Sequence, residues 1–373
     1  MQSEIRTLAR QFAQKEILPR VEEDEKTETF RPELIEQLGS LGLTGIPVSE
    51  TYEGAGLGYR EYTAAIEEIA KASASYAISV AVTGLPQVIL SNYGTEEQKK
   101  RWIPPLATGK AIGAFSLSEA VSGSDAAALI TTAKKEGNSY LLNGTKLWCT
   151  QGDVAETLIV MARTGGEGPK GISAFVVEKG MSGFRLGKRE KKMGCGISHT
   201  MELVFENTKI PESHLIGKEG EGFKIALSAL DSGRITIAAT AVGIAQAALD
   251  CAVHHAKERE QFGKPIGAQQ GVAFLLADMG TQIEAARLLV QQAATLKDKD
   301  QPYSQQAAMA KLFATDTAMK VTTDAVQILG GSGYTSEFPV ERYMREAKVT
   351  QIVEGTNQIQ RLVVGRHLLG GLR

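Results

Sequence analysis

Apolar and polar residues follow three successive patterns along the chain, and the first has the period of α-helices. In the N-terminal part, apolar residues recur three or four positions apart, as in residues 34–43 (LIEQLGSLGL), and stretches rich in glycine and proline separate the apolar stripes. Pro104 and Pro105 predict the end of the last helix in this part. The pattern therefore predicts an N-terminal helical domain over residues 1–111.

The pattern changes in residues 112–222, where short runs are rich in Val, Ile, Phe and Leu. Examples are residues 157–164 (TLIVMART), 171–180 (GISAFVVEKG) and 201–210 (MELVFENTKI). Such runs, bounded by glycine, aspartate or asparagine, are typical of β-strands, and residues 143–146 (NGTK) carry a tight-turn signal between two of them. We expect a small antiparallel β-domain here, in the form of a barrel or a sandwich.

The helical period returns in residues 223–373. Three long, Ala-rich and amphipathic segments follow one another there, at residues 223–260, 270–298 and 303–329. Long helices of this kind are only marginally stable alone, so they are expected to pack side by side in a four-helix-type bundle. The predicted fold class is therefore α+β, with a helical domain, a β-domain and a second helical domain in chain order.

Composition and charge exclude several classes of protein. Hydrophobic residues make up 43% and charged residues 23% of the chain, which excludes a largely disordered protein. The net charge of -2 provides no basic face for nucleic acid or for a membrane surface. The three cysteines form no CxxC pair, and the HExxH, GxSxG and GxxxxGK motifs are absent. We therefore expect no metal, no nucleic acid and no membrane among the binding partners.

Five segments carry candidate chemistry, and each of them also has a purely structural interpretation. Residues 115–125 (FSLSEAVSGSD) are either a strand ending in a Ser/Gly turn or a strand facing a polar heterocycle, with Gly123 permitting close approach. In residues 146–150 (KLWCT), Trp148 either belongs to the core or stacks on an aromatic cofactor, to which Thr150 would donate a hydrogen bond.

The other three segments lie in the C-terminal helical part of the chain. Residues 259–266 (REQFGKPI) place Arg259 where it would bind a phosphate or complement the C-terminal end of a helix. Residues 327–334 (QILGGSGY) are a helix C-cap or a set of backbone amides suited to a pyrophosphate. In residues 353–361 (VEGTNQIQR), Glu354 precedes an amphipathic helix, either as a complement to the helix dipole or as a catalytic carboxylate.

The order and spacing of these segments, with residues 230–234 (LDSGR) between the second and the third, resemble the flavin-dependent acyl-CoA dehydrogenase family over essentially the whole chain. LSExxSGSD and QILGGSGYxxExPxERxxR are the two signature regions of that family. The sequence looks closest to the short-chain (butyryl-CoA) and short branched-chain (isobutyryl-CoA) members.

The resemblance implies FAD as the cofactor. The isoalloxazine ring would be lined by Phe115, Leu117, Ser118, Gly123, Ser124, Trp148, Cys149 and Thr150. A neighbouring subunit would hold the pyrophosphate and adenosine with Arg259, Phe262, Gln270, Gln327, Ile328, Leu329, Gly330 and Gly331. The residues that would close over the cofactor are Thr356, Asn357 and Gln358. Ala120 stands where the family usually has proline and Cys149 where it has isoleucine, so we expect altered flavin tuning rather than lost binding.

The resemblance also implies the reaction, the α,β-dehydrogenation of a short-chain acyl-CoA to trans-2-enoyl-CoA. Glu354 would remove the α-proton and the flavin would accept the β-hydride, with electrons passed on to electron-transferring flavoprotein. The acyl-CoA would contact Ser124, Asp231, Arg234 and Gly355. Asp231 and Arg234, one helical turn apart, would equally form a structural ion pair. A split FAD site implies a homo-oligomer, commonly a dimer of dimers in the family.

Three alternatives stay open beside this interpretation. They are a dehydrogenase of isobutyryl- or 2-methyl-branched acyl-CoA, an acyl-CoA oxidase, and a catalytically silent helical scaffold. Oxidase chains are usually much longer, and the intact Glu354, Arg259 and glycine segments argue against a scaffold. The N-terminal residues resemble neither a secretory signal nor a mitochondrial presequence, so we expect a bacterial cytoplasmic protein, with a processed matrix protein as the alternative.

Overall fold

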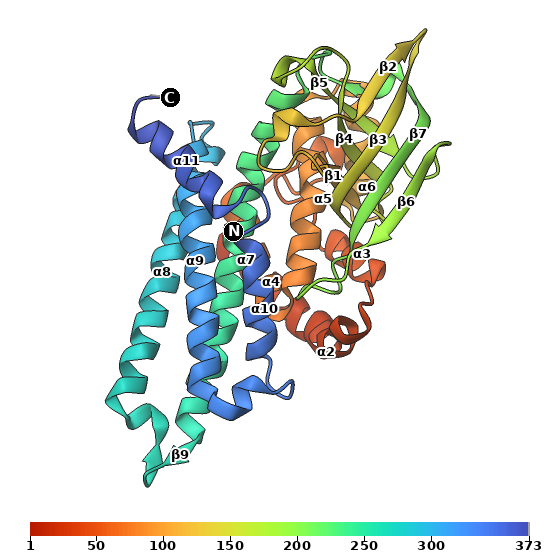
Figure 1. Cartoon of the computed structure of the whole chain (residues 1–373). Coiled ribbons are helices and arrows are strands. Elements are labelled where there is room, and N and C mark those ends of the chain that lie inside the picture. The colour runs from red at the N-terminus through yellow and green to blue at the C-terminus, as the bar shows by residue number, and fades with distance from the viewer. Residues whose placement is uncertain (372–373) are drawn as a thin grey trace.

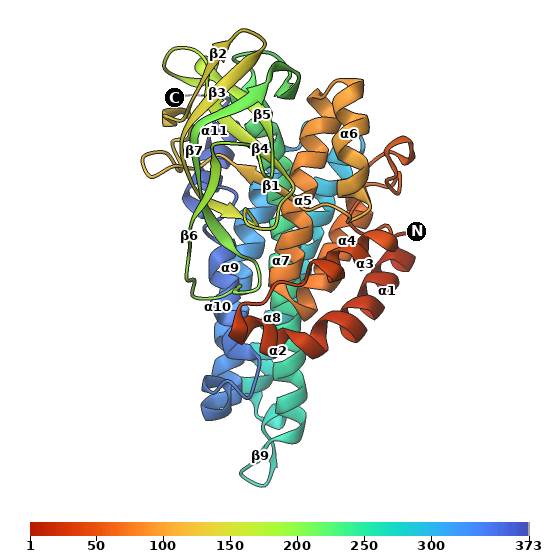
Figure 2. The same cartoon turned by 90° about the vertical axis from the view of Figure 1, so that its right-hand side faces the viewer.

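A computed structural model of the chain describes residues 1–371. Helices come first, a β-sheet follows, and a second set of helices completes the chain (Figure 1). The sheet lies beside the upper part of the C-terminal helices, and the N-terminal helices pack against both (Figures 1 and 2). This arrangement confirms the predicted α+β fold class.

The N-terminal helices form a small domain around a buried apolar core. They are α1 (Gln2–Phe12), the π-helical turn Ala13–Ile17, α2 (Leu18–Thr27), α3 (Pro32–Ser40), α4 (Tyr59–Ala72), α5 (Ala74–Tyr93) and α6 (Glu96–Ala107), with a short 3₁₀ turn at Glu50–Tyr52. The prediction that Pro104 and Pro105 end the last helix was wrong, because both lie inside α6. Proline lacks the N–H donor but keeps its carbonyl, and the Pro104 carbonyl accepts a hydrogen bond from Thr108 N at 3.0 Å.

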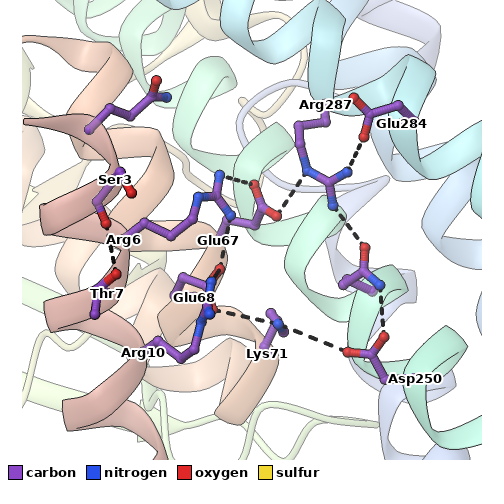
Figure 3. Close-up of polar contacts among 12 residues, drawn as sticks. Ser3, Arg6, Thr7, Arg10, Glu67, Glu68, Lys71, Asp250, Glu284 and Arg287 are labelled. Carbon is purple, nitrogen blue, oxygen red and sulfur yellow. Dashed lines mark hydrogen bonds and ion pairs between the residues drawn. The ribbon is translucent and has the colours of Figure 1, made fainter.

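Two adjacent carboxylates of α4, Glu67 and Glu68, hold α1 against the rest of the protein (Figure 3). Arg6 of α1 donates to Glu67 Oε2 at 3.1 Å and to Glu68 Oε1 at 2.9 Å. From the opposite side, Arg287 of α8 (Gln270–Asp298) donates to Glu67 Oε1 at 3.0 Å. Both carboxylates are buried, so their charges are stabilised by these arginines rather than by water. The network therefore ties three helices that are far apart in sequence.

The central domain is one eight-stranded sheet in which most neighbours are antiparallel. The strands are β1 (Gly113–Ser116), β2 (Thr132–Glu136), β3 (Ser139–Thr150), β4 (Thr157–Arg163), β5 (Ile172–Glu178), β6 (Phe184–Arg189), β7 (Thr200–Pro211) and β8 (Leu215–Ile216). They lie in the order β6-β7-β3-β2-β4-β5-β8, with β1 parallel to β4. In residues 1–371 no pairing joins β6 to β8, so the sheet is open and the barrel form that we expected is wrong. The edge strand β8 has only two residues, which leaves little backbone free for further pairing.

The predicted turn at residues 143–146 is also wrong, because β3 runs through this stretch without a break. The pairing of β3 with β7 shifts register between Leu142 and Gly144, which is a β-bulge. A Cβ atom at Gly144 would lie 2.4 Å from Thr131 Oγ1, so the glycine permits a close strand approach rather than a turn. The chain reverses instead at Gly137, whose φ is +60°.

The C-terminal domain is a helical bundle, as predicted. Its helices are α7 (Gly222–Glu258), α8, α9 (Ser304–Leu329), α10 (Val340–Thr350) and α11 (Asn357–Leu368), and the hairpin of β9 (Glu260–Gln261) and β10 (Lys264–Pro265) lies at the lower end in Figure 1. Helix α7 is the centre of the molecule, because α4 and α5 pack against it as well as α8, α9 and α10.

Two helices, α5 and α7, are long and apolar enough by composition to cross a membrane. Of their most apolar stretches, however, 89% in α5 and 72% in α7 is buried inside the protein. Both are therefore core helices, whose apolar surface is covered by neighbouring helices.

Candidate active site

Glu354 lies in the turn between α10 and α11 and faces α7. Its φ is +54°, and that of the following Gly355 is +86°. A residue other than glycine in this left-handed region is strained by about 1–2 kcal/mol, so surrounding contacts must hold the turn. The Gln360 side chain donates to the Gly355 carbonyl at 2.7 Å, and Thr356 Oγ1 caps α11 by accepting from Ile359 N at 3.3 Å.

The carboxylate of Glu354 lies in an environment suited to proton transfer. Its Oε2 atom is buried and has no hydrogen-bond partner among the residues that the structure describes. Burial raises the pKa of Glu354 to about 7, although the positive charges of Arg234 and Lys311 favour the ionised form. A carboxyl group with a pKa near 7 exchanges protons readily at neutral pH, which is what a general base requires.

Gly233 of α7 provides the space that the Glu354 carboxylate occupies. A Cβ atom at this glycine would lie 2.5 Å from Glu354 Oε2 and 2.9 Å from its Cδ. A glycine inside a long helix lowers helix stability by about 1 kcal/mol relative to alanine, so its presence there indicates a packing constraint. No role was predicted for Gly233 from the sequence, although a glycine inside a long helix is itself a signal.

Arg234 and Asp231 lie on α7 next to the same turn. Arg234 Nη1 is 2.5 Å from Asp231 Oδ1, so the ion pair one helical turn apart is present. Arg234 is buried, and its Nε atom has no partner within residues 1–371. Burial raises the pKa of Asp231. The structure thus brings Asp231, Arg234, Glu354 and Gly355 together, whereas Ser124 is exposed on the loop between β1 and β2.

The segments predicted to line the flavin ring lie side by side where β1 and β3 end. Leu147 N donates to the Ser118 carbonyl at 2.9 Å, which joins the two segments. Trp148 is 60% exposed with φ +60°, so the alternative that it belongs to the core is wrong. Cys149 is buried, so its side chain does not face the surface that Trp148 presents.

A buried ion pair between Glu119 and Lys146 fixes these two segments. Lys146 Nζ lies 2.7 Å from Glu119 Oε1 and donates to the Leu117 carbonyl at 3.0 Å. Glu119 also accepts from the backbone N–H groups of Ile130 and Thr131. Burial opposes ionisation of Glu119, but Lys146 and these donors together hold its pKa below the usual range. No role was predicted for Lys146 from the sequence, although a lysine inside a strand is itself a signal.

Replacing Lys146 with methionine is expected to lower the free energy of unfolding by about 3–5 kcal/mol, because it leaves the Glu119 carboxylate buried without its counter-charge. Denaturant unfolding of the two proteins side by side measures the difference. Lys134→Met on exposed β2 is the matched control and should change little. An equal loss in both variants would mean that the ion pair contributes nothing specific.

The residues predicted to hold the pyrophosphate and adenosine lie at the other end of the bundle, at the bottom of Figure 1. From Gly233, beside Glu354, to Glu258 at the end of α7 the helix rises by about 38 Å. Phe262 in the hairpin is 94% exposed, and Gly330, with φ +60°, caps α9. Within one chain, the residues predicted for the flavin ring therefore lie far from those predicted for the pyrophosphate and adenosine. The separated residues are Arg259, Phe262, Gln270, Gln327, Ile328, Leu329, Gly330 and Gly331.

Comparison with known protein families covers nearly the whole chain. Residues 1–110, 114–208 and 220–369 match the families described as the N-terminal, middle and C-terminal domains of acyl-CoA dehydrogenase. The chain is 51% identical over 369 residues to an acyl-CoA dehydrogenase of Bacillus subtilis, covering 98% of this chain and 97% of the relative. It is 46% identical to the short-chain specific acyl-CoA dehydrogenase of Clostridium acetobutylicum, covering 96% of each. The chain therefore belongs to the acyl-CoA dehydrogenase family, whose members are flavoprotein oxidoreductases.

Solved structures agree with this assignment. Butyryl-CoA dehydrogenase from Megasphaera elsdenii superposes with a TM-score of 0.97 at 47% identity, covering 99% of this chain and 98% of that one. A chain in the structure described as the electron transferring flavoprotein of Acidaminococcus fermentans has a TM-score of 0.98 at 50% identity, with coverages of 99% and 97%. Glutaryl-CoA dehydrogenase from Mycobacterium smegmatis in complex with FADH2 has a TM-score of 0.94 at 31% identity, with coverages of 99% and 94%.

Proposed function

We propose that this protein converts a short-chain acyl-CoA to the trans-2-enoyl-CoA, with Glu354 as the base that removes the α-proton. The observation that carries the proposal is the buried Glu354 Oε2, which has no partner among the described residues and belongs to a carboxyl with a pKa of about 7. Relatives named as short-chain specific and butyryl-CoA dehydrogenases support the substrate class. They favour a straight short chain over the branched alternative.

FAD is the cofactor in this proposal, and when bound it would supply the hydride acceptor. The paired segments around Phe115–Ser124 and Trp148–Thr150 fit one side of a flat aromatic ring, because they expose Trp148 and leave open space around Gly123. The FADH2 complex of a relative supports the same cofactor. Since the remaining predicted residues lie at the far end of the bundle, a second copy of the chain would complete the site. We therefore propose a homo-oligomer, and the resemblance to the family favours a dimer of dimers.

Removal of the α-proton needs help, because this proton is only weakly acidic. Entry of the acyl chain excludes water from Glu354 and strengthens it as a base. The backbone N–H of Glu354 makes no hydrogen bond within the described part of the chain, which leaves it free to donate to the thioester carbonyl. Arg234 would contact the acyl-CoA from α7, at the position where its Nε lacks a partner within residues 1–371.

The electrons would pass to electron-transferring flavoprotein. The closely similar chain in the structure of that flavoprotein from Acidaminococcus fermentans supports this partner. We place the protein in a bacterial cytoplasm, because bacterial relatives are among the most similar. The proposed dehydrogenation of an acyl-CoA places it in fatty acid β-oxidation. The relatives named as mitochondrial are animal proteins and do not support a matrix location for this chain.

An anaerobic titration of the FAD-loaded protein with butyryl-CoA and with isobutyryl-CoA tests the proposal. Bleaching of the flavin absorbance by butyryl-CoA is the expected result. Bleaching by isobutyryl-CoA alone would assign the protein to branched-chain degradation, and no bleaching by either would refute the short-chain assignment. Rapid reoxidation by air after bleaching would instead favour an acyl-CoA oxidase.

A further inference from the structure

A buried lysine, Lys311 of α9, lies directly against the turn that carries Glu354. Its side chain is fully buried. Its Nζ atom donates to the Gly355 carbonyl at 2.9 Å and to Asn357 Oδ1 at 2.8 Å. Gly355 lies in the turn between α10 and α11, and Asn357 is the first residue of α11, so the ammonium group holds the carbonyl of the residue that follows Glu354.

The surroundings of Lys311 differ from those of an ordinary buried ion pair. Its two acceptors are uncharged, and no salt bridge within residues 1–371 includes it. The charged groups that face it are Glu354 on the turn, Arg234 on α7 and Asp316 on α9. Burial lowers the pKa of Lys311 to about 7, against the attraction of Glu354. Burying an ammonium group with neutral acceptors is unfavourable, so its presence here indicates a requirement other than stability.

The contacts of Asn357 extend this arrangement along the same face of α9. Asn357 Nδ2 donates to Thr315 Oγ1 at 2.9 Å and to Asp316 Oδ1 at 2.7 Å. The Gly355 carbonyl accepts from both Lys311 Nζ and Gln360 Nε2. The left-handed conformation of Glu354 and Gly355 is therefore fixed from two sides, by α9 and by the first turn of α11.

We propose that Lys311 is a positioning residue for the base: its ammonium group fixes the Glu354–Gly355 turn and favours the ionised form of Glu354. The inference rests on the proposed function, in which Glu354 is the base. Because Lys311 lies beneath the turn and has no exposed surface, it acts on proton abstraction rather than on acyl-CoA binding. Loss of its charge leaves only Arg234 to oppose the effect of burial on Glu354.

The test compares Lys311→Met, which removes charge and donor, with Lys311→Gln, which keeps a donor, and Lys311→Arg, which keeps the charge. We expect Lys311→Met to lower kcat by about 10²-fold, as for a displaced catalytic group, with KM for butyryl-CoA nearly unchanged. In Lys311→Met the acidic limb of the kcat/KM profile should move to higher pH by about one unit. The reason is that an opposite charge near a carboxyl lowers its pKa by about that much or more, and this variant lacks that charge. Lys311→Arg should restore the limb, and Lys311→Gln should not.

The control is Lys320→Met, an exposed lysine of the same helix paired with Asp324, which should leave every parameter unchanged. Isotope-edited infrared titration of the Glu354 carboxyl in the protein without acyl-CoA reads its pKa directly and does not depend on turnover. An unchanged carboxyl pKa and kcat in folded Lys311→Met or Lys311→Gln protein would overturn the inference. If Lys311→Met does not fold, the carboxyl pKa and kcat of Lys311→Gln alone test the inference.

Parallel assays of Glu354→Gln separate this inference from the proposed function. If Glu354→Gln keeps its turnover, the base is wrongly assigned and the role of Lys311 fails with it. If Glu354→Gln is inactive but the Lys311 variants behave like the unsubstituted protein, only the role of Lys311 fails. If Glu354→Gln is inactive and the Lys311 variants behave as expected, Lys311→Met should cause no further loss of turnover in the Glu354→Gln background, because the two changes act on one group.

Discussion

Replacement of Glu354 by glutamine is expected to lower turnover by about 10²–10⁴-fold, the contribution of a positioned general base. Glutamine has nearly the same shape and cannot accept the α-proton. The residues around Trp148 and Arg234 are untouched, so FAD and acyl-CoA should still bind. Stopped-flow measurement of flavin bleaching by butyryl-CoA gives the rate of the chemical step, and the flavin spectrum reports retention of the cofactor.

The pH dependence of kcat/KM for the unsubstituted enzyme should report the titration of the Glu354 carboxyl group. Burial raises the pKa of Glu354 to about 7, so the carboxylate that acts as base forms only as the pH rises through that value. The kcat/KM for butyryl-CoA should therefore fall about tenfold per pH unit below pH 7. Glu354→Gln should lose this acidic limb.

The matched control for Glu354→Gln is Glu22→Gln, the same substitution at an exposed position of α2. It should leave the rate of flavin bleaching and its pH dependence unchanged. Near-normal bleaching by Glu354→Gln with bound FAD would mean that another group removes the proton.

Substitution of Gly233 with alanine is expected to impair catalysis with little effect on stability. The added methyl group would lie 2.5 Å from Glu354 Oε2, which is too close, so the carboxylate must move. The atoms that must move belong to the end of a flexible side chain, and alanine favours the helix by about 1 kcal/mol. A displacement of about 1 Å in a reacting group costs about 10²-fold in rate, so kcat should fall by about that factor.

The control for Gly233→Ala is Gly280→Ala in α8, where the added Cβ atom would meet only Leu249 Cδ2 at 3.8 Å, an ordinary contact. Both variants should unfold at or above the temperature of the unsubstituted protein, and only Gly233→Ala should lose bleaching rate. Equal rates in the two variants would show that the Glu354 carboxylate works from a different position.

The spacing of apolar residues along the chain was sufficient to predict the helical and β regions. The change from helical to strand period and back depends on residues within a few positions of each other, so the order of the three units and the long helix α7 were predicted from sequence. The segments around Glu354 and Trp148 were likewise recognisable, because their residues are contiguous in the chain. Their roles toward FAD and acyl-CoA remain predictions.

Contacts between distant segments were decided only by the tertiary structure. The glycine at position 144 has the sequence of a turn, but the approach of Thr131 makes it a bulge, and strand pairing leaves the sheet open. Gly233 and Lys311 look like ordinary helix residues in the sequence, yet packing of α7 and α9 brings both against the Glu354 turn. By itself, the sequence determined which elements form and in what order. The surroundings that raise the pKa of Glu354 were determined only by folding, because burial and charge there come from helices far apart in the chain.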